Sequence, residues 1–418
     1  TLAGSILLPA SKSYSVRAFL TAACGGRSVI IHPSECDDAL AAVCAAKHLG
    51  ARVVRERDCW HVTAGAGRED LRMINIKESG TVLRMLLPLI ALKNRPAVVT
   101  GEGTLKGRPN HHLIKTLREI GADAAGHGEG QSVPIQFRGG VLRGGALSID
   151  GSLSSQFVSA LLMTCPQLRE DSVIRISGRK VVSSDYITMT IQLLRRAGIR
   201  IQRVNLRTYK VRGGQTYKGL KRFHVPSDYG LAAFLLAAAA LTDSNVVLKG
   251  RLDDAFVQAD AHILRILTKM GCVFSKTSRS IRLKGPAALI GGVFSLKDCP
   301  DLLPILSVLG LFSSHSVTFS DIAHVRAKES DRISDLRQEL LKTGCRVDEG
   351  KDFMRVYPLK DTLCKQRIVF DSHRDHRLAM AFCVLGLKIG IKVQGVECVA
   401  KSYPGFLKDL SMLGAKVI

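Results

Sequence analysis

The chain has 418 residues, of which 46% are hydrophobic, so it is long enough for two domains that each bury a core. Lys and Arg number 60 against 36 Asp and Glu, and the net charge of +24 points to anionic partners: nucleic acid, a membrane surface or acidic small molecules. Nucleic-acid binding is disfavoured, because the basic residues are dispersed and aromatic residues make up only 5%. The longest strongly apolar stretch, 230–241, is too short to cross a bilayer.

Cysteine usage indicates the compartment. The chain has eleven cysteines, an odd number, with no CxxC pair and no metal-ligand spacing. Most lie in apolar runs, as Cys44, Cys165 and Cys383 do. This pattern is typical of reduced, buried thiols and predicts a cytoplasmic protein.

Six amphipathic stretches each end in a glycine followed by a short β-like run, and the glycines recur about every 70 to 77 residues. A helix C-terminus favours glycine because the closing residue adopts a left-handed backbone conformation. The pattern therefore predicts six copies of one unit, each with a helix, a stop and a strand. The glycines are Gly50, Gly121, Gly198, Gly271, Gly344 and Gly414.

A second series of helices is expected between these glycines. Each begins with serine or aspartate, is nearly all apolar along its body, and is predicted to be buried on most sides. The starts recur about every seventy residues, so each unit holds two helices, and the β-rich runs supply strands. The series begins near Ser11, Ser79, Ser154, Ser227, Asp301 and Asp375.

Polar and charged residues gather at the first turns of these apolar helices. In segment 9–18, Lys12, Ser13 and Arg17 lie where side-chain cations and free backbone N–H groups can bind a phosphate or carboxylate together. Ordinary capping explains a serine or aspartate at such a position, but it explains Arg84 and Arg377 less well. The sequence therefore predicts several helix starts aimed at anionic ligands.

A glycine, a loop arginine and several neutral donors extend this set of binding residues. Gly80 precedes Thr81 and would let a ligand approach the backbone closely. Arg108 lies in a predicted loop, which is where binding residues concentrate. The hydroxyl and amide donors suited to sugar-like hydroxyls and phosphate oxygens are Ser154, Ser155 and Gln156.

Two carboxylates are candidates for proton transfer. Local sequence favours Asp301 as an N-cap, with a general base as the alternative. Segment 324–333 predicts a helix start in which Lys328 and Arg332 share a face beside Glu329. A solvated charged helix is the other interpretation of this segment, but a carboxylate flanked by cations suits proton transfer near an anion.

Taken in order, the motifs SKSYSVRA, ESGTVLR, LKGRP, DGSLSSQFVSALLM, VVSSDYI, PDLLP, KESDRI, DHRLAMAF and AKSYPGF resemble those of the enolpyruvylshikimate phosphate synthase family. The resemblance runs over residues 9–406. It implies transfer of the enolpyruvyl group of phosphoenolpyruvate to the 5-hydroxyl of shikimate 3-phosphate with loss of phosphate, on the route to chorismate and aromatic amino acids. It implies no metal or organic cofactor, no nucleic-acid or membrane partner, and a monomer.

The resemblance also implies the fold: a two-domain, inside-out α/β (α+β) barrel built from six βαβαββ repeats, three per domain. Residues 11–226 would form the domain with most shikimate 3-phosphate contacts. Residues 1–10 and 227–418 would form the domain with the catalytic carboxylates and most phosphoenolpyruvate contacts. The active site is expected in the cleft between the domains, which would close on substrate binding.

Roles follow from the matching motifs. Asp301 resembles the base for the 5-hydroxyl, Glu329 the acid that protonates C3, and Lys12 a residue that touches both substrates. The resemblance assigns shikimate 3-phosphate to Lys12, Ser13, Arg17, Ser154, Ser155, Gln156, Ser183, Tyr186, Asp301 and Lys328. It assigns phosphoenolpyruvate to Lys12, Gly80, Thr81, Arg108, Gln156, Arg332, Arg377 and Lys401.

Three positions depart from the family pattern. Glu78 stands where asparagine is common and would place a negative charge near an anionic ligand, unless it pairs with an arginine or turns away. Met85 replaces a proline, and His324 replaces an asparagine. Gly80 keeps the small residue associated with inhibition by glyphosate, so the resemblance predicts sensitivity.

Three alternatives stay open. The sister family of UDP-N-acetylglucosamine enolpyruvyl transferases shares fold and chemistry, but its lysine-asparagine pair is Lys12-Ser13 here and its reactive cysteine is not evident. A nucleic-acid-binding repeat protein would use the +24 charge and lose affinity steeply with salt. A catalytically dead relative is disfavoured because Lys12, Asp301, Glu329 and Arg377 occur together.

Overall fold

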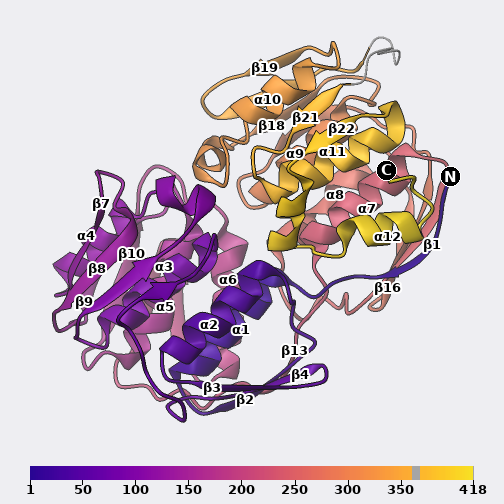
Figure 1. Ribbon diagram of the computed structural model, residues 1–418. Helices are drawn as coiled ribbons and strands as arrows, with labels where there is room; N and C mark the ends of the chain where they lie inside the picture. The colour runs from indigo at the N-terminus through magenta and orange to yellow at the C-terminus, as the bar shows by residue number, and fades with distance from the viewer. Residues whose placement is uncertain (360–367, 418) are drawn as a thin grey trace. The chain divides into compact units, whose positions relative to one another are not determined.

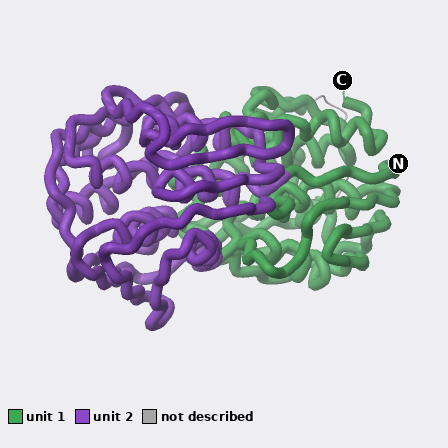
Figure 2. Tube along the Cα trace, turned by 90° about the horizontal axis from the view of Figure 1, so that it is seen from below, with its two compact units in different colours: residues 1–9, 226–418 green, residues 10–225 purple. Residues whose placement is uncertain are grey.

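The computed structural model describes residues 1–359 and 368–417, and the chain divides into two compact units (Figures 1 and 2). Unit 2 holds residues Ala10–Val225, and unit 1 holds Thr1–Pro9 with Pro226–Ile418. Both units combine helices with small mixed sheets, so the α/β class is confirmed. None of the helices in the described ranges is long and apolar enough to span a bilayer.

Unit 2 contains three pairs of helices and three sheets. The helices are α1 (Lys12–Cys24), α2 (Asp37–His48), α3 (Gly80–Ala91), α4 (His111–Glu119), α5 (Ser155–Thr164) and α6 (Ser184–Arg196). The strands are β2 (Arg27–Ile31), β3 (Arg52–Glu56), β4 (Cys59–Thr63), β5 (Ile74–Asn75), β6 (Ala97–Thr100), β7 (Asp123–His127), β8 (Ser132–Gly139), β9 (Gly145–Asp150), β10 (Ser172–Ser177), β11 (Ile201–Asn205), β12 (Thr208–Val211) and β13 (Lys221–His224).

Unit 1, in its described residues, also has three pairs of helices, with ten strands. Its helices are α7 (Tyr229–Leu241), α8 (His262–Lys269), α9 (Leu303–Gly310), α10 (Ser334–Leu341), α11 (His376–Ile389) and α12 (Phe406–Met412). Its strands are β1 (Leu2–Leu7), β14 (Ser244–Lys249), β15 (Phe274–Lys276), β16 (Ser280–Gly285), β17 (Gly292–Ser295), β18 (Val317–Ser320), β19 (Val347–Glu349), β20 (Phe353–Val356), β21 (Val369–Asp371) and β22 (Lys392–Gln394). Short 3-10 helices precede or follow several of these elements.

Five of the six sheets in the described ranges share one topology. In the sheet β13-β2-β4-β3, the first pair is parallel and the next two pairs are antiparallel. The sheets β5-β6-β8-β7, β9-β10-β12-β11, β1-β14-β16-β15 and β17-β18-β20-β19 have the same arrangement. Within the described residues the sixth sheet is the parallel pair β21-β22. This recurrence agrees with the repeat read from the glycine spacing.

The six predicted stop glycines all have positive φ, between 81° and 114°. Each follows the second helix of a pair, where a left-handed residue ends the helix without the strain that a Cβ would bring. Five of them lead into a strand, as expected. The sixth expectation is wrong, because residues 415–417 after Gly414 join neither β21 nor β22.

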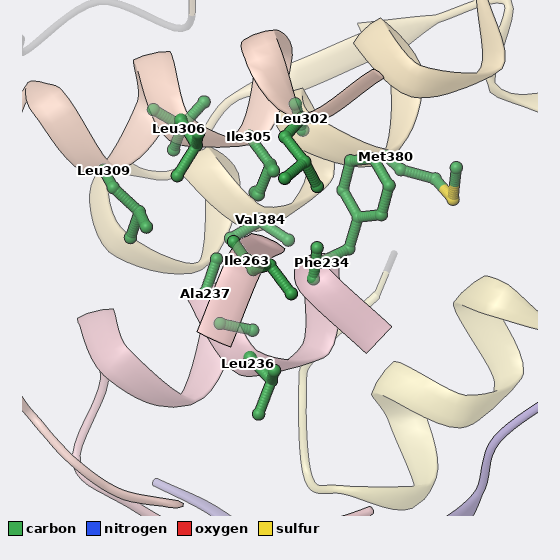
Figure 3. Close-up of a cluster of buried hydrophobic side chains, with 14 of the residues drawn as sticks. Phe234, Leu236, Ala237, Ile263, Leu302, Ile305, Leu306, Leu309, Met380 and Val384 are labelled. Atoms are coloured by element: carbon green, nitrogen blue, oxygen red, sulfur yellow. The ribbon is translucent and has the colours of Figure 1, made fainter. Parts of the chain in front are cut away.

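The apolar helices form the cores. In unit 1, α7, α9 and α11 pack against one another (Figure 3). Every residue of α7 is buried. Phe234, Leu306 and Val384 come from these three helices and belong to one buried cluster. Each such side chain contributes about 1.5 to 3 kcal/mol by leaving water. In unit 2, α3 packs against α1 and α5 and is almost as deeply buried.

This burial explains where polar residues lie. The bodies of the first helices are enclosed by apolar neighbours, so polar side chains collect at the helix starts. Ser11, Ser79 and Ser154 cap α1, α3 and α5, and Asp228 and Asp375 cap α7 and α11. Side-chain caps of this kind satisfy backbone N–H groups that the helix leaves free.

Candidate active site

Unit 1 gathers three cations around Asp301, which lies in the 3-10 helix Pro300–Leu302 just before α9. Its Oδ1 is 2.6 Å from Nη1 of Arg332 and 3.7 Å from Nζ of Lys328, and its Oδ2 is 3.0 Å from Nη2 of Arg377. Asp301 caps no helix here, so the N-cap interpretation is wrong. Three cations favour the charged carboxylate, which is the form that can accept a proton.

Arg332 is the centre of this cluster and is 1% exposed. Its Nε and Nη2 donate to the two oxygens of Asp375 at 2.7 and 3.1 Å, and Nη2 also donates to Oε2 of Glu329 at 3.1 Å. Burial lowers the pKa of Arg332, but Asp375, Asp301 and Glu329 outweigh this effect and the net pKa is raised well above its ordinary value. The guanidinium therefore holds both candidate carboxylates in fixed positions.

Glu329 lies between two cations. Its Oε2 contacts Arg332, and its Oε1 is 3.3 Å from Nζ of Lys401, which ends the 3-10 helix Val396–Lys401. The side chains of Glu329 and Lys401 are both more than nine-tenths buried. The two cations favour the ionised form of this carboxylate. When an arriving anion pairs with one of them, protonation of the carboxylate becomes less costly, so the group can then accept and donate a proton.

The local chain path differs from the predicted helix start. A 3-10 helix covers Ala323–Ala327, and α10 begins only at Ser334, so Lys328 and Arg332 do not share a helix face. The reason is Asp331, whose Oδ1 accepts the backbone N–H groups of Ile333 and Ser334, both at 3.2 Å. Arg326 fixes Asp331 by a contact of 2.7 Å. Lys328 and Arg332 still converge, because both reach Asp301.

Unit 2 holds Arg17 by neutral groups. Arg17 projects from α1, and its Nε donates to Oγ1 of Thr190 at 2.8 Å. Its Nη1 donates to the carbonyl of Ser13 at 3.0 Å, and its guanidinium lies 5.7 Å from the ring centre of Tyr186. Burial lowers the pKa of Arg17 to about 10, so it stays cationic at neutral pH. None of these contacts supplies a negative charge, which suits binding of an anion.

A second arginine in unit 2 organises the neutral donors. Arg84 on α3 donates from Nη1 to Oε1 of Gln156 at 2.9 Å and to Oγ of Ser154 at 3.2 Å. Gln156 in turn donates from Nε2 to Oγ1 of Thr81 at 2.9 Å. The starts of α3 and α5 are thereby joined side chain to side chain. Arg84 also stacks over Phe157 at 4.9 Å, which fixes its orientation.

Two further contacts complete the unit 2 site. Nζ of Lys12 lies 3.0 Å from Oδ2 of Asp38, which is in the first turn of α2. The guanidinium of Arg108 lies over Gly80, and a Cβ at Gly80 would meet its Nη1. Glycine at this position therefore lets Arg108 lie against the start of α3.

The remaining predicted residues lie in the same helix starts. Ser13 and Ser155 are in the first turns of α1 and α5. Ser183 immediately precedes α6 with a left-handed φ of 56°, and Tyr186 is in the first turn. The structure thus brings the predicted residues of unit 1 into one cluster, and it places those of unit 2 at neighbouring helix starts. The residues of unit 1 touch one another directly, whereas those of unit 2 are joined partly through Thr190 and Arg84.

Sequence reasoning missed several residues of these groups. The sequence analysis does not single out Asp38, Thr190 or Asp260, whose Oδ2 lies 3.7 Å from Nη2 of Arg377. Asp375 appears there as a helix start in the charged segment 371–377, without a role as the partner of Arg332. Thr190 and Asp260 lie far along the chain from their partners and carry no distinctive local signal. Asp38 had one weak signal, since two aspartates open α2.

The structure shows what surrounds the three residues that depart from the family pattern, Glu78, Met85 and His324. Glu78 accepts a hydrogen bond from Oγ1 of Thr104 at 3.3 Å and lies against Gly103, so its carboxylate points toward the 3-10 helix Gly103–Gly107. Met85 is fully buried in α3. His324 is buried, and burial followed by repulsion from Lys328 lowers its pKa to about 3, so its ring is neutral.

Comparison with known proteins identifies the family. The family model for EPSP synthase (3-phosphoshikimate 1-carboxyvinyltransferase) matches residues 1–410. This chain belongs to the EPSP synthase family. A 3-phosphoshikimate 1-carboxyvinyltransferase of Methanothrix thermoacetophila is 36% identical over 100% of this chain and 97% of its own length. A 3-phosphoshikimate 1-carboxyvinyltransferase of Archaeoglobus fulgidus is 34% identical over 98% of this chain and 96% of its own length.

Solved structures show the same fold. An EPSP synthase from Acinetobacter baumannii superposes with a TM-score of 0.79 at 24% identity, covering 99% of this chain and 96% of that one. The expected two-domain α/β fold of the family and the resemblance itself are therefore confirmed.

Proposed function

We propose that this chain is an enzyme, a 3-phosphoshikimate 1-carboxyvinyltransferase. It transfers the enolpyruvyl group of phosphoenolpyruvate to the 5-hydroxyl of shikimate 3-phosphate and releases phosphate, within the shikimate pathway to aromatic amino acids. Full-length membership of the EPSP synthase family supports the activity. The observation that carries the chemistry is the pair of carboxylates, Asp301 and Glu329, held by one buried arginine.

In this proposal Asp301 takes the proton of the 5-hydroxyl group of shikimate 3-phosphate. The oxygen of that hydroxyl forms a bond to C2 of phosphoenolpyruvate at the same time. Glu329 gives a proton to C3, which makes a methyl group in a tetrahedral intermediate. Removal of a proton from that methyl group, with cleavage of the C2–O bond to phosphate, restores the double bond and releases phosphate. Glu329 can accept this second proton, and the leaving phosphate can take the proton held by Asp301, so both carboxyl groups end in their starting states.

The charges around Glu329 support this cycle. Lys401 and Arg332 favour the ionised carboxylate in the free protein. We assign both cations to phosphoenolpyruvate, so an arriving anion shares them and makes protonation of Glu329 less costly. Four of the five N–H groups of Arg332 already donate to carboxylates, which leaves one on Nη1 for the substrate.

The unit 2 group suits binding. Arg17 carries a charge that its neighbours do not neutralise, which fits the phosphate ester of shikimate 3-phosphate together with Ser13, Ser155, Ser183 and Tyr186. The proposal requires both groups to act on one pair of substrates, as expected for the family. The monomeric state, the cytoplasmic location and the lack of a metal or organic cofactor stay predictions.

The test is release of inorganic phosphate by the purified protein given shikimate 3-phosphate and phosphoenolpyruvate. Omission of either substrate and replacement of shikimate 3-phosphate by UDP-N-acetylglucosamine are the controls. Release only with the shikimate pair supports the proposal. Release only with the sugar nucleotide would move the chain to the sister activity, and no release with either would favour a dead relative.

A further inference from the structure

A third carboxylate, Asp260, faces the same arginine as Asp301. It lies in the 3-10 helix Ala259–Ala261 and is 6% exposed. Its Oδ2 is 3.7 Å from Nη2 of Arg377, and the same Nη2 is 3.0 Å from Oδ2 of Asp301. One guanidinium group thus lies between two carboxylates from different elements.

The start of α7 holds Asp260 in this buried position. Gln258 ties the two elements together, since its Oε1 accepts the N–H of Tyr229 at 3.2 Å and its Nε2 donates to the carbonyl of Ser227 at 2.8 Å. Gly230 provides the space, because a Cβ at this position would collide with Oδ2 of Asp260. The carboxylate is therefore fitted to a site that Gly230 leaves open.

Charged groups from four elements face Asp260. They are Arg377 on α11, Asp301 before α9, Asp228 at the cap of α7 and Lys328 after the 3-10 helix Ala323–Ala327. Burial raises the pKa of Asp260 to about 7; Arg377 and Lys328 oppose this rise, while Asp301 and Asp228 reinforce it. Near neutral pH this side chain therefore changes between neutral and anionic forms.

The two forms affect Arg377 differently. An anionic Asp260 shares the guanidinium charge with Asp301 and repels a second anion that approaches it. A neutral Asp260 leaves more of that charge available. The orientation of Arg377 depends less on Asp260, because Asp301 lies closer and its carbonyl is a further acceptor at 3.5 Å.

We propose that Asp260 is a positioning residue that acts through Arg377, and that its charge sets how tightly Arg377 holds the anionic substrate. The inference rests on the proposed function, in which Arg377 binds phosphoenolpyruvate. Protonation of Asp260 by solvent strengthens binding of phosphoenolpyruvate, and loss of that proton weakens it. Shikimate 3-phosphate, assigned mainly to unit 2, is affected much less.

The experiment measures kcat and KM for phosphoenolpyruvate from pH 6 to 8.5, at saturating shikimate 3-phosphate, in the wild type, Asp260→Asn and Asp254→Asn. Between pH 6 and 8.5 we expect KM for phosphoenolpyruvate to rise at least about fivefold more in the wild type than in Asp260→Asn. An effect of this size is typical of coupling between two sites. Ionisation of the substrate itself affects all three proteins equally and cancels in the comparison. Asp254, 87% exposed, is the control and should follow the wild type.

The KM for shikimate 3-phosphate should show the same pH course in all three proteins. If KM for phosphoenolpyruvate in Asp260→Asn follows the wild-type curve, the inference is overturned. Wild-type protein that releases no phosphate would instead reject the proposed function. Gly230→Ala tests the same contact from the other side, and it should flatten the curve as Asp260→Asn does.

Stability supplies a readout that needs no turnover. Because the folded-state pKa lies near 7 and the ordinary value is 3.8, Asp260 costs stability as the pH rises between these values, and the full cost remains above 7. The melting temperature of Asp260→Asn minus that of the wild type should therefore be larger at pH 8 than at pH 5. A difference that does not change with pH would contradict the buried titration on which the inference depends.

Discussion

The two groups of site residues use their arginines in opposite ways. Arg332 in unit 1 is enclosed by Asp301, Glu329 and Asp375, so its charge is more than balanced. Arg17 in unit 2 is held by a hydroxyl and backbone carbonyls, so its charge stays available. Both are almost completely buried. The comparison suggests that unit 1 fixes carboxylates for proton transfer and that unit 2 supplies positive charge for binding.

Asp301→Asn should break the unit 1 side of this comparison with the largest effect. An amide cannot take the proton of the 5-hydroxyl, and we expect kcat to fall by about 100-fold or more. The measurement is phosphate release under saturating substrates, with thermal melting to verify folding. A folded Asp301→Asn protein that keeps wild-type kcat would remove Asp301 from the role of base.

Arg17→Gln should break the unit 2 side. Loss of a buried cation opposite a phosphate typically costs 2 kcal/mol or more, so we expect KM for shikimate 3-phosphate to rise about 30-fold or more, with a smaller change in kcat. Arg203→Gln is the control, because Arg203 lies on the exposed strand β11. A loss of kcat with unchanged KM would argue that the two units do not divide the work as proposed.

Gly80→Ala should weaken phosphoenolpyruvate binding. The added methyl group meets the guanidinium of Arg108, which must move, so we expect KM for phosphoenolpyruvate to rise about fivefold to tenfold, or roughly 1 kcal/mol. Gly107→Ala is the matched control, since nothing lies within 4 Å of its added Cβ. Equal KM values in the two variants would show that Arg108 does not depend on the space above Gly80.

The same site should respond to glyphosate. We expect wild-type turnover to be inhibited by millimolar glyphosate, because Gly80 keeps the small residue of sensitive members of the family. Phosphate release is measured with and without the inhibitor, at low phosphoenolpyruvate. A normal turnover rate under these conditions rejects the expectation.

Glu78→Gln should have the smallest effect. The carboxylate of Glu78 is engaged with Thr104 and lies against Gly103, so removing its charge should change KM for phosphoenolpyruvate by less than about twofold. Steady-state kinetics at low ionic strength give the most sensitive measurement. A KM that drops tenfold would mean that Glu78 faces the substrate after all.

Much of the fold could be predicted because its signals are local. Each stop glycine marks a backbone conformation that one residue adopts, and Gly50 and Gly344 show it as clearly as the rest. The burial of α7 follows from its unbroken run of apolar residues. The failed expectation after Gly414 shows the limit, because a strand also needs a neighbour to pair with.

The candidate site was less accessible to such reasoning. The charges of segment 324–333 predict cations around a carboxylate, as the structure has them, but not the path of the chain. The first turn ends at Ala327, and Asp331 accepts the N–H groups of Ile333 and Ser334 where α10 begins. The sequence predicts a helix on which Lys328 and Arg332 share a face. In the structure they meet instead at Asp301, a residue of another element.

The sequence by itself determined the repeat, the buried helices, the charged helix starts and the family, because periodicity, capping and motif order are properties of neighbouring residues. Only the tertiary structure decided which charges are balanced. Asp375 holds Arg332, Thr190 holds Arg17, and Asp260 faces Arg377. These partners are far apart in the chain, and a buried charge is defined by what packs around it, which no local pattern records.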